Sequence, residues 1–127
     1  MSTTANAGRA VSACRPTAGT PVTIQADSIE STAEEYLQAF KAELDGAGYV
    51  PAEVVVRGDF GDDCSISTQS EADRVRDVIH AADFIGAGTV RLEIADVADE
   101  AKVRPAISAL RERAQREGLT LAVDGLT

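Results

Sequence analysis

The chain has 127 residues, with 21 acidic and 12 basic side chains, so its formal net charge at pH 7 is −9. This length suits one domain, because single domains most often have about 100 to 150 residues. The acidity argues against nucleic acid as a partner, and no apolar run reaches the roughly 20 residues of a membrane-spanning helix.

The basic residues are mostly arginine: lysine occurs only at Lys41 and Lys102. High acidity with little lysine resembles the composition of proteins from salt-loving archaea, where salt screens exposed charges strongly. The two cysteines, Cys14 and Cys64, lie far apart and belong to no metal-binding motif. We therefore expect a salt-adapted cytoplasmic protein with reduced thiols and no cofactor.

Residues 1–20 are predicted to form a flexible N-terminal tail, and residues 21–127 a single domain. Within the domain, short alternating runs predict strands and longer runs with apolar residues three or four apart predict helices. The expected elements, in chain order, are a strand at 22–26, a helix at 31–45, a strand at 53–57, a hairpin strand at 64–68, a helix at 70–85, a strand at 89–95, a helix ending near residue 117 and a strand at 119–123.

Local signals support several of these boundaries. Ser31 and Glu34 have the spacing of a capping box, which marks a helix start. Gly86 and Gly118 follow helical runs and are typical of helix ends. Pro105 lies inside the last helical run, so we expect this helix either to begin close to Pro105 or to be kinked there.

The resulting order is β-α-β-β-α-β-α-β. Three of the strands alternate apolar and polar residues, as in the strand at 89–95, which is typical of an antiparallel or mixed sheet with one solvated face. We therefore predict an α+β fold with a single open-faced sheet and helices on one side. A doubly wound three-layer fold is the alternative.

This order, from Val22 to about Glu117, resembles that of HPr, the histidine-containing phosphocarrier protein, which implies an open-faced β-sandwich. The similar pieces are residues 22–24 before the first helix and residues 88–94 before the last. HPr activity needs a His followed by Arg-Pro at the start of the first helix, where residues 29–33 here read Ile-Glu-Ser-Thr-Ala. The resemblance therefore implies the fold without the phosphoryl acceptor.

A weaker resemblance, over residues 56–123, is to STAS-type regulatory domains. A strand that ends in Gly-x-x-Asp, a helix, a Gly, a strand and a last amphipathic helix recur in that order. The Ser-containing loop of those domains corresponds to residues 96–99, which hold neither Ser nor Thr. The resemblance thus implies a regulatory fold, and it transfers no site residue.

Two groups of residues could carry chemistry. His80, the only histidine, lies three residues after Asp77 and could act as an oriented base, although a surface histidine is the favoured interpretation. Asp59, Asp62 and Asp63 share a glycine-containing loop that could bind a cation loosely, although a solvated acidic turn is favoured. We assign no catalytic, cofactor-binding or metal-binding residue from these patterns.

Charge is unevenly distributed along the chain: residues 27–101 hold 18 acidic and 5 basic side chains. The last predicted helix, in contrast, is basic. Its candidate interaction patch consists of Lys102, Arg104, Arg111, Arg113 and Arg116. These side chains either pair with acids of the same chain or contact an acidic protein, which includes a second copy of this chain.

The leading hypothesis is a non-enzymatic module for regulation or assembly that works through protein contacts. It is favoured because no catalytic constellation is complete and because the charges are segregated. The alternative is a phosphoacceptor or small-ligand module that uses Ser31 or the loops at the strand exits. An enzyme of unknown class is the third interpretation.

Overall fold

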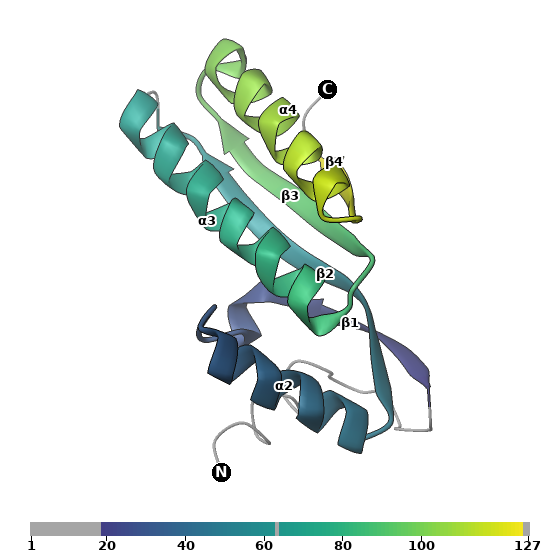
Figure 1. Cartoon of the computed structure of the whole chain (residues 1–127). Helices are drawn as coiled ribbons and strands as arrows, with labels where there is room; N and C mark the ends of the chain where they lie inside the picture. The colour runs from purple at the N-terminus through teal and green to yellow at the C-terminus, as the bar shows by residue number, and fades with distance from the viewer. Residues whose placement is uncertain (1–18, 63, 126–127) are drawn as a thin grey trace.

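The computed structural model describes residues 19–62 and 64–125. The predicted tail lies outside these ranges except for its last two residues. The elements are β1 (Thr20–Gln25), the short 3-10 helix η1 (Ala26–Ser28), α2 (Glu34–Gly46), β2 (Tyr49–Phe60), α3 (Ser65–Ile85), β3 (Thr89–Val97), α4 (Glu100–Arg116) and β4 (Thr120–Asp124) (Figure 1).

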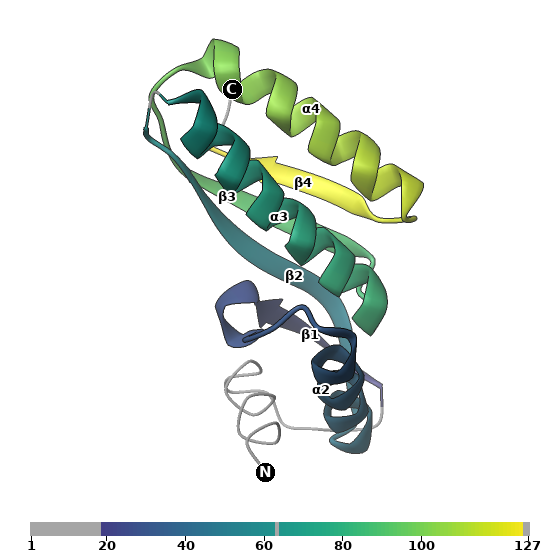
Figure 2. The same cartoon turned by 60° about the vertical axis from the view of Figure 1, so that its left-hand side comes forward.

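All four strands form one sheet in the order β1-β2-β3-β4, and every neighbouring pair is parallel. Each successive pair of strands is joined through an α-helix, because the chain must return to the start of the sheet before a parallel strand can begin. The helices α2, α3 and α4 cover the same face of the sheet (Figures 1 and 2). The opposite face is uncovered in the described part of the chain.

The core lies between this helical layer and the sheet. In β1, the buried Val22 and Ile24 alternate with the exposed Pro21, Thr23 and Gln25. The buried residues of the other strands pack into the same cluster as the apolar stripes of the helices. The predicted α+β fold, with one open-faced sheet and helices on one side, is confirmed.

The expectation of an antiparallel or mixed sheet is wrong, because all three strand pairs are parallel. Alternation of apolar and polar residues reports that one face of a strand is buried and the other is not. It carries no information on strand direction. Here helices cover only one face, so a parallel sheet shows the pattern that two-sided parallel sheets lack.

The predicted hairpin strand at 64–68 is also wrong: these residues form the N-cap and first turn of α3, and β2 extends to Phe60. The amide of Thr68 donates to the Cys64 carbonyl in a helical hydrogen bond of 3.0 Å. Thr68 is buried and lies four residues before the buried Ala72, so it continues the inward face of α3 by one turn. The order is therefore β-α-β-α-β-α-β.

The glycine signals for helix ends are confirmed, but the predicted capping box is wrong, because α2 begins at Glu34 and no side chain caps it. Gly86 ends α3 in the left-handed conformation with φ 91°, which glycine adopts without strain. At the start of α4, Asp99 accepts a hydrogen bond of 2.9 Å from the Ala101 amide, and Pro105 lies inside this helix rather than at its start. No helix in the described ranges is both long and apolar enough to cross a membrane.

Candidate functional site

The uncovered face of the sheet carries a cluster of charges that spans three strands. Arg91 lies on β3, and its Nη1 donates to Oδ2 of Asp124 on β4 at 3.0 Å. Its Nη2 donates to Oε2 of Glu53 on β2 at 3.2 Å. One guanidinium therefore connects β2, β3 and β4 on the side away from the helices, and we call these three residues the Arg91 cluster.

The Arg91 cluster is open to solvent on this face. The pKa of Arg91 lies above its usual range because its guanidinium donates hydrogen bonds first to Glu53 and then to Asp124. The Arg91 side chain is 37% exposed and that of Asp124 is 55% exposed, so water and salt weaken these pairs. Each of these two ion pairs therefore contributes only a little to the stability of the fold.

Two further charges on this face have no ion-pair partner among the described residues. Arg57 on β2 and Glu93 on β3 are both exposed and stand directly opposite each other in the strand register. Thr23 and Gln25 on β1 complete a polar surface. The open face thus offers both signs of charge together with neutral polar groups.

The predicted acidic loop lies at the carboxyl ends of β2 and β3. Asp59, Gly61, Asp62 and Asp96 line a shallow hollow there. Oδ1 of Asp59 accepts a hydrogen bond of 2.9 Å from the Gly61 amide, and Oδ2 of Asp62 accepts one of 3.0 Å from the Ser67 hydroxyl. These carboxylates are therefore engaged in local turn contacts.

Within residues 19–62 and 64–125, no three His, Cys, Asp or Glu side chains are placed to hold a metal ion. Asp63, the third acid of the predicted loop, lies outside the described residues. Asp96, the residue after the predicted strand at 89–95, lies beside the loop because β2 and β3 are parallel neighbours. A carbon atom added at Gly61 would come within 2.7 Å of Oδ2 of Asp96.

His80, which the sequence analysis favoured as a surface histidine, is exposed on α3, and its Nδ1 lies 3.7 Å from Oε1 of Glu117 at the end of α4. Asp77 instead lines a different hollow, together with Asp27 and Ser31. His80 lies 15 residues after Ser65, the first residue of α3, which is about 22 Å along a helix. The structure therefore separates His80 from the acidic loop at the other end of α3.

Ser31, the proposed phosphoacceptor, accepts a hydrogen bond of 3.0 Å from the Ala33 amide just before α2. The nearest helical carboxylates of α2, Glu34 and Glu35, are negative and would repel a phosphate. Arg74 lines the same hollow as Ser31, but its guanidinium also donates to the Arg57 carbonyl. Ser31 therefore stabilises the turn that precedes α2.

The candidate patch on α4 is exposed along its whole length, and its members Arg104 and Arg113 pair with acidic side chains close to them in the sequence. Nη2 of Arg104 lies 3.2 Å from Oε1 of Glu100, and Nε of Arg113 lies 2.7 Å from Oε2 of Glu117. Arg116 has no ion-pair partner among the described residues, and Arg111 is exposed. Arg104 and Arg113 therefore pair with acids of the same chain, which was one of the two interpretations of the patch.

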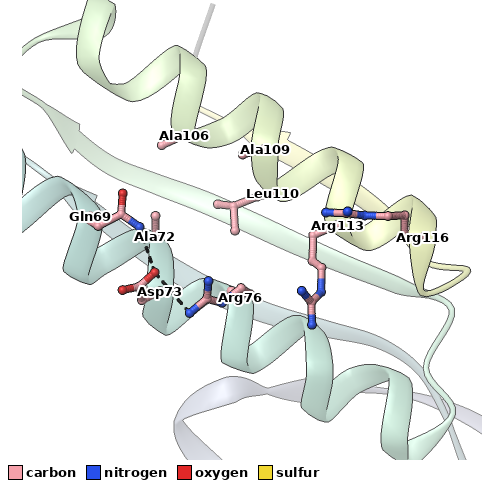
Figure 3. Close-up of a pocket in the computed structure, with 9 residues that line it drawn as sticks. All are labelled: Gln69, Ala72, Asp73, Arg76, Ala106, Ala109, Leu110, Arg113 and Arg116. Carbon is pink, nitrogen blue, oxygen red and sulfur yellow. Dashed lines mark hydrogen bonds and ion pairs between the residues drawn. The ribbon is translucent and has the colours of Figure 1, made fainter.

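Arg113 and Arg116 also line a groove between α3 and α4 that has a volume of about 180 Å³ (Figure 3). Figure 3 shows Arg113 reaching from α4 toward α3, where Arg76 lies across the groove. Nη2 of Arg76 lies 3.4 Å from Oδ1 of Asp73. The groove is lined by Gln69, Ala72, Asp73, Arg76, Ala106, Ala109, Leu110, Arg113 and Arg116.

Sequence reasoning missed Arg76 and the Arg91 cluster. Arg76 lies in the acidic segment at 27–101, and nothing in its neighbours shows that α3 packs against α4. Glu53, Arg91 and Asp124 were visible only as polar positions of alternating strands. Their contact depends on which strands are neighbours.

The model of a family described as a domain of unknown function, DUF8564, matches residues 18–123. No curated protein matches the chain significantly. The chain is similar to the crystal structure of a xylose isomerase domain protein from Planctomyces limnophilus, with a TM-score of 0.64 and 17% sequence identity. The match covers 83% of this chain and 44% of that one, so the chain spans less than half of its solved neighbour.

Proposed function

The chain belongs to DUF8564, a family of domains of unknown function, and we propose that it is an assembly module that acts through protein contacts rather than by catalysis. The observation that carries this proposal is the uncovered face of a fully parallel sheet. In the described part of the chain, helices lie on one face, and the other face presents the Arg91 cluster, Arg57 and Glu93.

Parallel sheets almost always have both faces covered, because helical crossovers occupy them. The outer strands β1 and β4 each have one strand neighbour in the described part of the chain, so one edge of each is unpaired. Unpaired edges expose backbone N–H and C=O groups that accept another strand. A partner that covers the open face and pairs with these edges would provide the missing second layer and the missing strand neighbours.

The charges on the open face indicate the chemistry of that partner. Arg57 and Glu93 are one cation and one anion without ion-pair partners in the described residues, and the Arg91 cluster is already paired. A surface with both signs of charge fits another protein surface of mixed charge. A polyanion would meet Glu53, Glu93 and Asp124 as repulsive neighbours.

Solvent accessibility of the open face tests this proposal. A cysteine is placed at Thr23 on the open face (Thr23→Cys) or at Ser108 on the exposed side of α4 (Ser108→Cys), both in a background with Cys14→Ser and Cys64→Ser. Maleimide labelling is followed in dilute solution, in concentrated solution and in cell extract. We expect protection of position 23 as concentration or extract increases, with position 108 unchanged.

Equal labelling of both positions under all three conditions would show that nothing covers the face, and the proposal would then be wrong. Protection of both positions to the same extent would show aggregation, which also contradicts it. The comparison with Ser108 therefore separates a specific contact from general crowding.

A second candidate is recognition of an acidic protein segment at the groove between α3 and α4. Three guanidinium groups, those of Arg76, Arg113 and Arg116, surround this groove. Its volume of about 180 Å³ is below the roughly 300 to 1,000 Å³ of pockets that hold whole small molecules, and it suits a single carboxylate side chain. Only Arg116 is without an ion-pair partner in the described ranges.

Binding of a short oligo-glutamate peptide at constant ionic strength tests this candidate. Arg116→Gln should weaken binding severalfold, because it removes the one guanidinium of the groove that is not already paired. Arg111→Gln, on the same helix but outside the groove, is the matched control. An equal effect of both substitutions would assign the binding to general charge rather than to the groove.

A further inference from the structure

The four strands of this sheet follow the chain order from one edge to the other, and α2, α3 and α4 connect them on one face. This is the arrangement of consecutive units in an eight-stranded barrel of parallel strands with helices outside. The described chain supplies four such strands. Its match to 44% of the solved xylose isomerase domain protein, at a TM-score of 0.64, agrees with half of a larger fold.

Two irregularities in the sheet favour curvature. The register between β1 and β2 shifts between Val22 and Thr23, and the register between β2 and β3 shifts between Gly58 and Asp59. Such bulges increase local twist and are frequent at barrel rims. Closing a sheet into a barrel requires this twist and stagger.

The two free edges match each other in length and direction. β1 has 6 residues and β4 has 5, and both run in the same direction within the sheet. When two copies face each other around a two-fold axis, β4 of one copy lies beside β1 of its partner, parallel to it. The symmetry repeats this pair on the other side, so eight strands close without a free edge.

We propose that the open face is covered by a second copy of this chain, and that two copies close an eight-stranded parallel barrel. This inference rests on the proposed assembly function and names its partner. It places the helices outside and the mixed-charge face inside.

The charges on the open face allow this burial. In the Arg91 cluster the guanidinium is already paired with two carboxylates, so closure leaves no isolated Arg91 charge inside. On the open face of each copy, Arg57 and Glu93 have no ion-pair partner among the residues that the structure describes. An eight-stranded barrel is just wide enough for its side chains to fill, so Arg57 of one copy can reach Glu93 of its partner.

The mass in solution is the first test. Light scattering coupled to size-exclusion chromatography should give twice the 13.3 kDa of the chain across a concentration series, in low and in high KCl. A mass of 13.3 kDa at every concentration overturns the second-copy inference. Protection of position 23 in extract alone would then leave the assembly function standing with a different partner.

Directed crosslinking tests the geometry. Chains with Thr23→Cys and chains with Ala122→Cys, both free of Cys14 and Cys64, are mixed and oxidised. Within one chain, β1 and β4 are three strand spacings apart, about 14 Å, which a disulfide cannot bridge. We expect a covalent dimer from the mixture and little from either variant alone, since identical strands lie across the barrel from each other.

A covalent dimer from Thr23→Cys alone, at the same yield, would show that two β1 strands meet, and the barrel would be wrong. The same result from the mixture of Thr23→Cys with Ser108→Cys would show random collisions, which also contradicts it. Ser108 lies on the exposed side of α4 and is the matched position outside the barrel.

A charge exchange tests the interior contact. Glu93→Arg places two cations opposite each other in the assembly and should raise the dimer dissociation constant by about tenfold or more in low salt. The double variant Arg57→Glu with Glu93→Arg restores opposite charges and should recover the dimer. Residues 57 and 93 are also opposite each other in the sheet of a single chain, so thermal unfolding of the monomer is followed in parallel, and only a loss of dimer larger than the loss of monomer stability supports the contact. A double variant no better than Glu93→Arg contradicts the contact.

Discussion

Arg91 and Asp124 are 33 residues apart in the sequence, yet Nη1 of Arg91 donates to Oδ2 of Asp124 at 3.0 Å across the β3–β4 pair. The same guanidinium reaches Glu53 on β2 at 3.2 Å. Arg91 therefore compensates two carboxylates of the open face. Removal of the Arg91 guanidinium should therefore lower the stability of the fold by an amount that depends on salt.

We predict that Arg91→Gln lowers the melting temperature in low KCl and that the loss shrinks in high KCl. Without the guanidinium, Glu53 and Asp124 repel each other across the sheet, and salt screens that repulsion. Thermal unfolding followed by circular dichroism measures both values. Arg111→Gln, exposed on α4, is the control. A loss that is independent of salt would show that Arg91 acts by packing instead.

A second prediction concerns the contact between α3 and the end of β2. Oε2 of Glu71 accepts a hydrogen bond of 2.7 Å from the Asp59 amide, and Oε1 of Glu71 accepts one of 2.8 Å from Nε of Arg74. Arg74 in turn donates to the Arg57 carbonyl. The hydrogen bond from Arg74 holds the pKa of Glu71 below its usual range.

Because the folded pKa of Glu71 is below its unfolded value, its contribution to stability is present above the unfolded pKa of about 4.3 and is lost as pH falls through the folded pKa. We expect Glu71→Gln to cost about 1 kcal/mol of unfolding free energy at pH 7 and less at acid pH. Urea unfolding at several pH values measures this difference. An equal cost at all pH values would contradict an ionic role.

A third prediction contrasts two glycines. Gly125 follows β4 with φ 94°, and an added carbon would lie 2.6 Å from the Ile94 carbonyl oxygen. Gly46 closes α2, and nothing lies within 4 Å of its added carbon. Gly125→Ala should therefore destabilise by about 1 to 2 kcal/mol, whereas Gly46→Ala should stabilise by up to about 1 kcal/mol.

Chemical unfolding of the two variants under one condition provides the measurement. If Gly125→Ala proves neutral, β4 ends without the close approach to Ile94. If Gly46→Ala destabilises, the end of α2 requires more backbone freedom than its helical conformation indicates.

The last prediction concerns Cys64, which is exposed and precedes α3. Hydrogen bonds from the backbone amides of Ser67 and Ile66 lower the pKa of its thiol. In a Cys14→Ser variant, the rate of iodoacetamide alkylation should reach half its plateau at a lower pH in the folded chain than in urea. Identical midpoints in both states would show that the helix start does not affect the thiol.

Local sequence patterns were sufficient for most of the elements. Val22 and Ile24 marked the buried side of β1, and Gly86 marked the end of α3. Both signals can be recognised within a few residues of sequence: one is the alternation of apolar side chains, and the other is a glycine that adopts the left-handed backbone conformation. The same locality explains the error at 64–68. The buried face of α3 extends back to Thr68, and because threonine is polar, the sequence pattern did not predict that this residue is buried.

The sequence by itself thus determined that the described part of the chain would form a sheet buried on one face, with helices against it. Only the tertiary structure decided that the strands are parallel, that Arg91 joins Glu53 to Asp124, and that Arg76 lies across from Arg113. Periodicity records which side of an element is buried, whereas strand direction and helix neighbours depend on residues far apart in the chain. The uncovered face of the parallel sheet, on which the proposed assembly rests, likewise depends on contacts between residues far apart in the chain.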